Sequence, residues 1–223
     1  MRCTVKNPRR EHLEGYVNEL LFEYWPATMK KLGLDIEAYD YPQIQFCKGD
    51  SHFDPHRDNS ICLNYNIVRK AYHKKEFELQ GMKIDYEEIL LEDIVHETVH
   101  YVQENFYSVH ESGYNCTIEG MATAISLKVL IDEKKYKIPA AKIADMHKKI
   151  GEKYKKCFEI PKKYEKHIRK IIKSDMKPKS LKEYAAGFIY ICKYYPTSNE
   201  HLLELLITPF EDEECFEEFK ILN

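Results

Sequence analysis

The sequence predicts an α+β protein in which a small sheet precedes a mostly helical C-terminal half. Three observations support this prediction. Short apolar or alternating runs gather between residues 43 and 68, and apolar residues recur at helical spacing after residue 85. The chain of 223 residues is 43% hydrophobic with 8 glycines and 9 prolines, which provides a core and excludes a disordered or fibrous chain. This length suits a single domain spanning residues 1–223.

The first half of the chain predicts one helix and two strands. A helical apolar stripe precedes Pro26, where we expect the helix to end. Residues 43–47 alternate between polar and apolar side chains, as a half-buried strand does. Residues 49–59 form a polar loop, and residues 61–68 are apolar enough for a second strand, so an antiparallel or mixed sheet is expected.

Three further helices are expected. Asp85 stands three residues before Glu88, which is the pattern of a capping box, and the helix that follows should run to about Tyr107. Thr117 is the expected N-cap of a second helix that runs to about residue 131. Ser180 and Glu183 repeat the capping pattern before a helix that Pro196 closes.

Charge is distributed unevenly, although the formal net charge is only −3. Residues 134–182 contain 18 lysines and arginines against five acidic residues, whereas residues 200–218 contain eight acidic residues and no lysine or arginine. The basic segment could attract nucleic acid. Its isoleucines recur at helical spacing and it contains no known nucleic-acid module, which favours the solvated face of ordinary helices. The acidic C-terminal tail, residues 200–223, could pair with it.

Several classes of protein are excluded or disfavoured by composition. No apolar run approaches the roughly 18 residues of a membrane span, and residues 1–10 lack the apolar core of a secretory signal. The seven cysteines stand singly, without a CxxC pair, which indicates a reducing compartment. We therefore expect a cytoplasmic protein with no membrane partner.

The segment His96-Glu97-Thr98-Val99-His100 carries the clearest chemical signal. A helix turns about 100° per residue, so His96 and His100 lie one turn apart and both imidazoles can reach one cation. Glu97 can reach a water bound to that cation without becoming a ligand. Zn²⁺ suits this arrangement, because it lowers the pKa of its water and Glu97 can take the proton.

A third ligand is expected on the next helix. Eighteen residues separate His100 from Glu119, which begins Glu119-Gly120-Met121-Ala122. A turn between the two helices lets the second helix run back across the first, with Glu119 facing the histidines. Gly120 and Ala122 are small enough to let the two helices approach closely.

These residues resemble the gluzincin metallopeptidases, whose pattern is His-Glu-x-x-His followed after about eighteen to twenty-five residues by a Glu, often within Glu-Gly-x-Ala. The resemblance implies a zincin-like fold and a zinc metallopeptidase that hydrolyses a peptide or protein substrate. His96, His100 and Glu119 would be the zinc ligands and Glu97 the general base. It also implies an edge strand that binds substrate backbone, for which residues 61–68 are the match by position.

A further similarity lies in Tyr184-Ala-Ala-Gly187-Phe188. It resembles the segment by which aminopeptidase-type gluzincins place a tyrosine over the metal, and this implies that Tyr184 donates a hydrogen bond to the oxyanion. The alternative is that Tyr184 is a structural tyrosine. No Gly-x-Met-Glu-Asn segment is present, so the resemblance does not extend to aminopeptidase specificity.

Other residues are also candidates for metal binding or for support of the zinc site. His52, Asp54, His56 and Asp58 could hold a metal at the surface, and His110 or Thr123 could support the zinc site. A different class of function stays open as well. The chain could be an inactive or latent zincin-like binding protein that docks a partner through residues 134–182. Glu97 argues against that alternative, because a purely structural zinc site needs no base.

Overall fold

The computed structural model describes most of the N-terminal half of the chain and little of the C-terminal half. The described residues are 8–35, 40–57, 59–79, 82–107 and 115–133, together with residues 187, 191, 211, 213 and 214. Four helices and two small sheets make up this part, so the predicted α+β class is confirmed. The basic segment 134–182, most of the acidic tail, His110 and Tyr184 lie outside the described residues.

Helix α1 (Arg10–Lys31) is longer than the sequence predicts, because it continues through Pro26. Proline removes one helical hydrogen bond and crowds the preceding turn. The residues around it, Trp25 and Met29, are fully buried, so the packing of this last turn outweighs the cost of the proline. The helix ends instead at Lys31, and Gly33, just past the C-cap Leu32, has a φ of 69°, the left-handed conformation that favours glycine after a helix end.

The first sheet is mixed, as expected, with strand order β1-β3-β2. Strand β1 (Gln43–Cys47) pairs in parallel with β3 (Ser60–Asn64), and β2 (His52–Asp54) pairs with β3 in antiparallel orientation. The predicted strand 61–68 is therefore wrong at its end, because helix α2 (Tyr65–Tyr72) begins there. The Asn64 side chain accepts hydrogen bonds from the amides of residues 66 and 67, which starts that helix.

The position of β3 also corrects the expected substrate strand. Strand β3 lies in the middle of the sheet, so the edge strand that could bind substrate is not at residues 61–68. A short edge strand, β2, occurs instead within the predicted polar loop. A second sheet, the hairpin of β4 (Glu76–Leu79) and β5 (Met82–Asp85), was not expected from the sequence and leads directly into α3.

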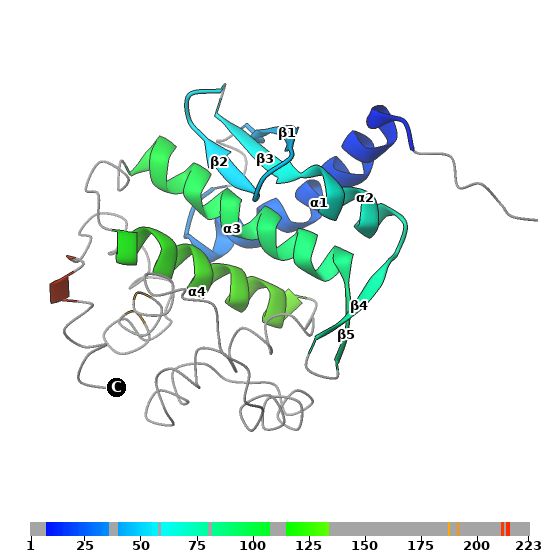
Figure 1. Ribbon diagram of the computed structural model, residues 1–223. Helices are drawn as coiled ribbons and strands as arrows, with labels where there is room; N and C mark the ends of the chain where they lie inside the picture. Colours follow the sequence, from blue (N-terminus) through cyan, green and yellow to red (C-terminus); the bar gives the residue numbers. More distant parts are fainter. Residues whose placement is uncertain are drawn as a thin grey trace, which may run out of the picture.

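Helices α3 and α4 lie side by side beneath the first sheet (Figure 1). Helix α3 (Tyr86–Phe106) has the predicted bounds with Asp85 as N-cap, although the Asp85 side chain does not make the capping hydrogen bond. Helix α4 (Asn115–Glu133) begins two residues before the predicted N-cap, so Thr117 is a buried helical residue. Both helices are largely buried, which makes their contact the centre of the core.

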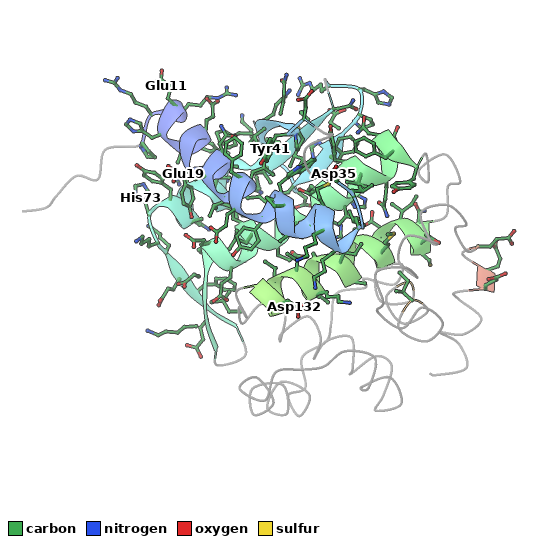
Figure 2. All side chains as sticks on the ribbon, turned by 180° about the vertical axis from the view of Figure 1, so that it is seen from behind. Glu11, Glu19, Asp35, Tyr41, His73 and Asp132 are labelled. Carbon is green, nitrogen blue, oxygen red and sulfur yellow. The ribbon has the colours of Figure 1, made fainter. Side chains whose placement is uncertain are left out.

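Helix α1 covers the back of this pair (Figure 2) and contacts α2, α3 and α4. A salt bridge of 2.6 Å between Lys31 and Asp132 joins the ends of α1 and α4. Among the helices of the described residues, none combines the length and apolar composition that a bilayer crossing requires. Because α3 is held from the back by α1 and from above by the sheet, its side chains have fixed positions facing α4.

Candidate metal centre

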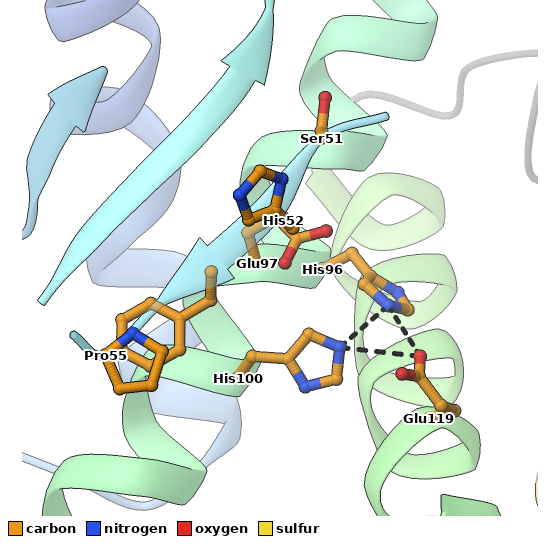
Figure 3. A pocket seen from close by; sticks show the side chains of 8 residues that line it. Ser51, His52, Pro55, His96, Glu97, His100 and Glu119 are labelled. Atoms are coloured by element: carbon orange, nitrogen blue, oxygen red, sulfur yellow. Dashed lines mark hydrogen bonds and ion pairs between the residues drawn. The ribbon is translucent and has the colours of Figure 1, made fainter. Parts of the chain in front are cut away.

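His96, His100 and Glu119 converge at the contact between α3 and α4 (Figure 3). The two Nε2 atoms of the histidines are 3.0 Å apart. The Oε2 atom of Glu119 lies 3.2 Å from His96 Nε2 and 3.4 Å from His100 Nε2. The three side chains that the sequence predicts as ligands therefore form a nearly equilateral triangle of ligand atoms.

The size of this triangle fits a zinc ion. Zinc bonds to nitrogen and oxygen of about 2.0–2.1 Å, at tetrahedral angles, place neighbouring ligand atoms about 3.3 Å apart. The spacing of 3.0 to 3.4 Å between the ligand atoms needs almost no rearrangement to match it. The donor set of two imidazoles and one carboxylate leaves a fourth position open, as catalytic zinc sites do.

Gln103, which the sequence reasoning missed, determines which nitrogen of His100 is available. The Gln103 Nε2 donates to the carbonyl of Ile118 at 3.1 Å, so the amide oxygen faces the Nδ1 of His100, 2.8 Å away. An amide oxygen only accepts, so His100 Nδ1 carries the proton and, in the neutral ring, the Nε2 lone pair points to Glu119. Gln103 is fully buried and thereby connects α3 to the backbone beside Glu119.

His100 and Glu119 shift each other's pKa in this cluster. Burial alone would raise the pKa of Glu119, but the hydrogen bonds from His100 and His96 outweigh it and hold this pKa well below its ordinary value. Burial would also lower the pKa of His100, yet the hydrogen bond to Glu119 and the charges of Glu97 and Glu119 raise it to about 8. The position between the three side chains therefore attracts a cation, either a proton or a metal ion.

Glu97 lies beside the ligands and lines the same pocket (Figure 3). Its side chain belongs to the buried part of α3, with a residue exposure of 6%. The pocket has a volume of about 240 Å³ and is open to solvent on one side. A carboxylate that is not a ligand but shares a small open pocket with three ligands is in a position to exchange a proton with a molecule bound there.

Strand β2 and its neighbours form the opposite wall of the pocket. The lining residues from this segment are Ser51, His52, Phe53 and Pro55. The Ser51 hydroxyl donates to Asp93 of α3 at 2.6 Å and accepts from the Asn64 amide at 3.1 Å, which fixes the strand against the helix. From the sequence this segment was expected to be a polar loop with His52 as a candidate surface ligand, and its place beside the α3 histidines was not predicted.

The remaining candidates are placed as follows. Thr123 is buried one turn after Glu119, and its hydroxyl has no hydrogen-bond partner in the described part of the chain. His52 and Asp54 lie together, but with Cys62 in place of His56 as the third neighbour. Asp58, His110 and Tyr184 lie outside the described residues, so the role of Tyr184 stays a prediction.

Comparison with known proteins adds no family to these observations. No protein-family model matches the chain, and neither a curated protein nor a solved structure matches it. The arguments for a function therefore rest on the residues of the pocket.

Proposed function

We propose that this protein is a zinc-dependent metallopeptidase of gluzincin type, with a zincin-like fold. The observation that carries the proposal is the triangle of ligand atoms from His96, His100 and Glu119, beside Glu97 in an open pocket. The spacing of the ligand atoms supports zinc. The presence of a carboxylate that is not a ligand supports hydrolysis over a purely structural site.

The chain's own residues would divide the work. His96, His100 and Glu119 would hold zinc, with Gln103 keeping the His100 ring in the required tautomer. When bound, zinc supplies a Lewis acid and lowers the pKa of a coordinated water. Glu97 would take a proton from the attacking water at its carboxylate and deliver it to the leaving amine. The resemblance implies that the Tyr184 hydroxyl donates to the developing oxyanion.

The substrate in this proposal is a peptide or protein segment in extended conformation. Strand β2 pairs only with β3 among the described strands and lines the pocket, so its outer edge offers free backbone groups for one more strand. For this reason β2, rather than residues 61–68, is the strand that we propose to bind substrate backbone. The three described cysteines are all free thiols, which supports the proposed cytoplasmic location.

A second candidate function is a latent or inactive binding protein that docks a partner through residues 134–182. That segment contains 18 basic and five acidic residues, and this excess of positive charge favours the binding protein. The two candidates differ in one property, which is whether the wild-type chain cleaves peptides when zinc is bound.

The first prediction tests the role of Glu97. Glu97→Gln should lower the rate of peptide hydrolysis by about 10² to 10⁴, because an amide cannot accept the proton. It should leave the zinc content unchanged, since Glu97 is not a ligand. The measurement combines elemental analysis with cleavage of a mixed peptide library by the full-length chain.

His100→Ala is the matched control, because it should remove one equivalent of zinc together with activity. Equal hydrolysis by wild type and Glu97→Gln would reject the mechanism. A zinc-loaded wild type that cleaves no member of the library would favour the binding protein.

A further inference from the structure

A second group of potential metal ligands lies on the β2–β3 strand pair. It shares no proposed ligand with the first site, although His52 also lines the first pocket. His52, Asp54 and Cys62 each offer one ligand atom, and these atoms lie within 4.8 Å of one another. The strand register explains why they meet. His52 is paired with Cys62 across the two strands, and Asp54 follows His52 by two residues on the same face.

The side chains of this group leave the two strands on the face opposite to Phe53, and His52, on the edge strand, also reaches the pocket beside α3. Side chains alternate along a strand, so Phe53 and its partner Ile61 point to the opposite face from His52 and Asp54. The Phe53 ring contacts Tyr101 of α3 with ring centroids 5.8 Å apart, which identifies the face turned to the helix. The three ligand atoms therefore lie on the other face of the strand pair, where His52 is exposed, Asp54 is half-buried and Cys62 is buried.

The hydrogen bonds around His52 and Asp54 leave one ligand atom of each available, and the Cys62 thiol contacts the Ser60 hydroxyl at 4.0 Å. His52 Nδ1 lies 3.0 Å from the Asp50 carbonyl, which can only accept, so Nδ1 carries the proton and the neutral ring presents its Nε2 lone pair. Asp54 accepts the His56 amide at 3.1 Å with Oδ1, which orients the carboxylate and leaves Oδ2. These are the supporting contacts that metal ligands receive from neighbouring groups.

We infer that His52, Asp54 and Cys62 bind a second divalent cation of the zinc class, which clamps the edge strand β2 to β3. One thiolate, one imidazole and one carboxylate suit zinc or cobalt, whereas calcium and magnesium require an oxygen shell. Tetrahedral bonds place a zinc-bound sulfur and nitrogen about 3.5 Å apart. The ligand atoms lie within 4.8 Å of one another, so they must close by about 1.3 Å at most. His52 is exposed, which leaves its ring free to make this adjustment.

The consequence of the clamp concerns the pocket described above. Strand β2 has only three residues and stands at the edge of its sheet, and its residues His52 and Phe53 line the pocket. A cation bound across His52 and Cys62 would fix the position of that wall by a bond additional to the strand ladder. The cation site itself does not depend on the proposed peptidase activity.

The test is a cobalt titration of the full-length chain after removal of bound metal. Cobalt bound by a thiolate gives a charge-transfer absorption band in the near ultraviolet, which the site of His96, His100 and Glu119 cannot give. We expect about two equivalents of cobalt per chain, one for each group of ligands, and a thiolate band. Cys62→Ala should remove the band and one equivalent.

Cys47→Ala is the matched control, because Cys47 lies in the same sheet but outside the ligand group. Its thiol donates to the carbonyls of Gly49 and Asp50 at 3.5 and 3.4 Å. Burial raises the pKa of this thiol, and the neighbouring Cys62 raises it further. This variant should keep the band and both equivalents. His100→Ala should lose one equivalent and keep the band, so failure of the first site and failure of this site give different results.

A wild-type chain without the thiolate band would overturn the proposal, as would a band that survives in Cys62→Ala. His52→Gln provides a second variant at an exposed position, where folding does not depend on the side chain. It should lose the band at stoichiometric cobalt, and undiminished binding would also overturn the proposal.

Discussion

Gln103 has two functions that a single glutamine can combine. Its amide oxygen accepts from His100 and its amide nitrogen donates to the Ile118 carbonyl, so one side chain orients a proposed ligand and connects α3 to α4. The residue stands three positions after His100 and therefore on the same helical face. The sequence alone did not identify this role, because the orientation of the Gln103 amide depends on the Ile118 carbonyl, which only the folded chain brings beside it.

Two substitutions separate these functions. In Gln103→Glu the carboxylate still accepts from His100 Nδ1, so we expect a zinc affinity within a few-fold of wild type. The Ile118 carbonyl loses its donor in this variant, so the unfolding free energy should fall by about 1–3 kcal/mol. In Gln103→Leu both contacts are lost, and zinc affinity should fall by about 10- to 100-fold. The measurements are zinc competition with a chelating dye and urea unfolding. Equal zinc affinity in Gln103→Leu and wild type would reject the orienting role.

The coupled charges of His100 and Glu119 predict the pH dependence of the metal-free protein. The pKa of His100 is raised from 6.5 to about 8, so its contribution to stability is complete below pH 6.5 and is lost as pH rises through 8. This contribution is about 2 kcal/mol. The pKa of Glu119 is lowered from its ordinary value of 4.5, so its contribution is present above that pH and is lost in acid. The pair should therefore stabilise the metal-free chain most between about pH 5 and 6.5.

Urea unfolding of the chelated protein at pH 6 and at pH 8.5 measures this effect. His100→Gln is the control, because it removes the titrating group and should remove most of the loss between these two pH values. A wild type whose stability is unchanged, or a His100→Gln variant with the same loss, would contradict the assignment.

At the scale of elements, the sequence predicted best where a long helix carries its own pattern. The Asp85–Glu88 pattern predicted the start of α3 and the apolar period its end, and Glu119 lies on the next helix as expected. The errors occurred where distant packing decides. Buried Trp25 and Met29 carry α1 through Pro26, and the Asn64 cap turns an apolar run into α2. Strands β2 and β4 do alternate between polar and apolar residues, but with three and four residues they are too short for the alternation to stand out from a polar loop.

Gly187 is packed tightly against the start of α4. A Cβ at this position would collide with the Cys116 carbonyl and would lie 2.9 Å from the Cα of Gly120, the residue after Glu119. Gly187→Ala should therefore displace the first turns of α4, lower the unfolding free energy by about 1–3 kcal/mol and weaken zinc binding.

Gly15→Ala is the matched control for that substitution. Gly15 lies within α1, where an added Cβ meets no atom within 4 Å. Alanine there should raise the unfolding free energy by about 0.5–1 kcal/mol and leave zinc binding unchanged. A Gly187→Ala variant as stable as wild type would show that α4 can move away from the added Cβ without loss of unfolding free energy.

At the scale of the whole molecule, the three proposed ligands connect two helices on which the core is built. Helix α3 carries two ligands and contacts the sheet, α1 and α2, while α4 carries the third and contacts α1 and α3. A metal ion that bridged them, as proposed, would bind only when this packing exists. Its binding free energy is therefore added to the stability of the folded chain as a unit, rather than to one helix.

This coupling predicts a thermal shift that depends on the ligands and not on catalysis. With free zinc at about a hundred times its dissociation constant, the folded state gains about 2.7 kcal/mol, which corresponds to a rise in Tm of about 5–10 °C for a chain of this size. A Cys62→Ala background confines the effect to the α3–α4 site, because the strand-pair group then lacks its thiol. In that background Glu97→Gln should show the full shift, since the carboxylate is not a ligand, whereas Glu119→Gln should show a much smaller one. Differential scanning calorimetry with and without zinc measures both. A full shift in Glu119→Gln would remove this residue from the ligand set and leave His96 and His100 to bind the ion without it.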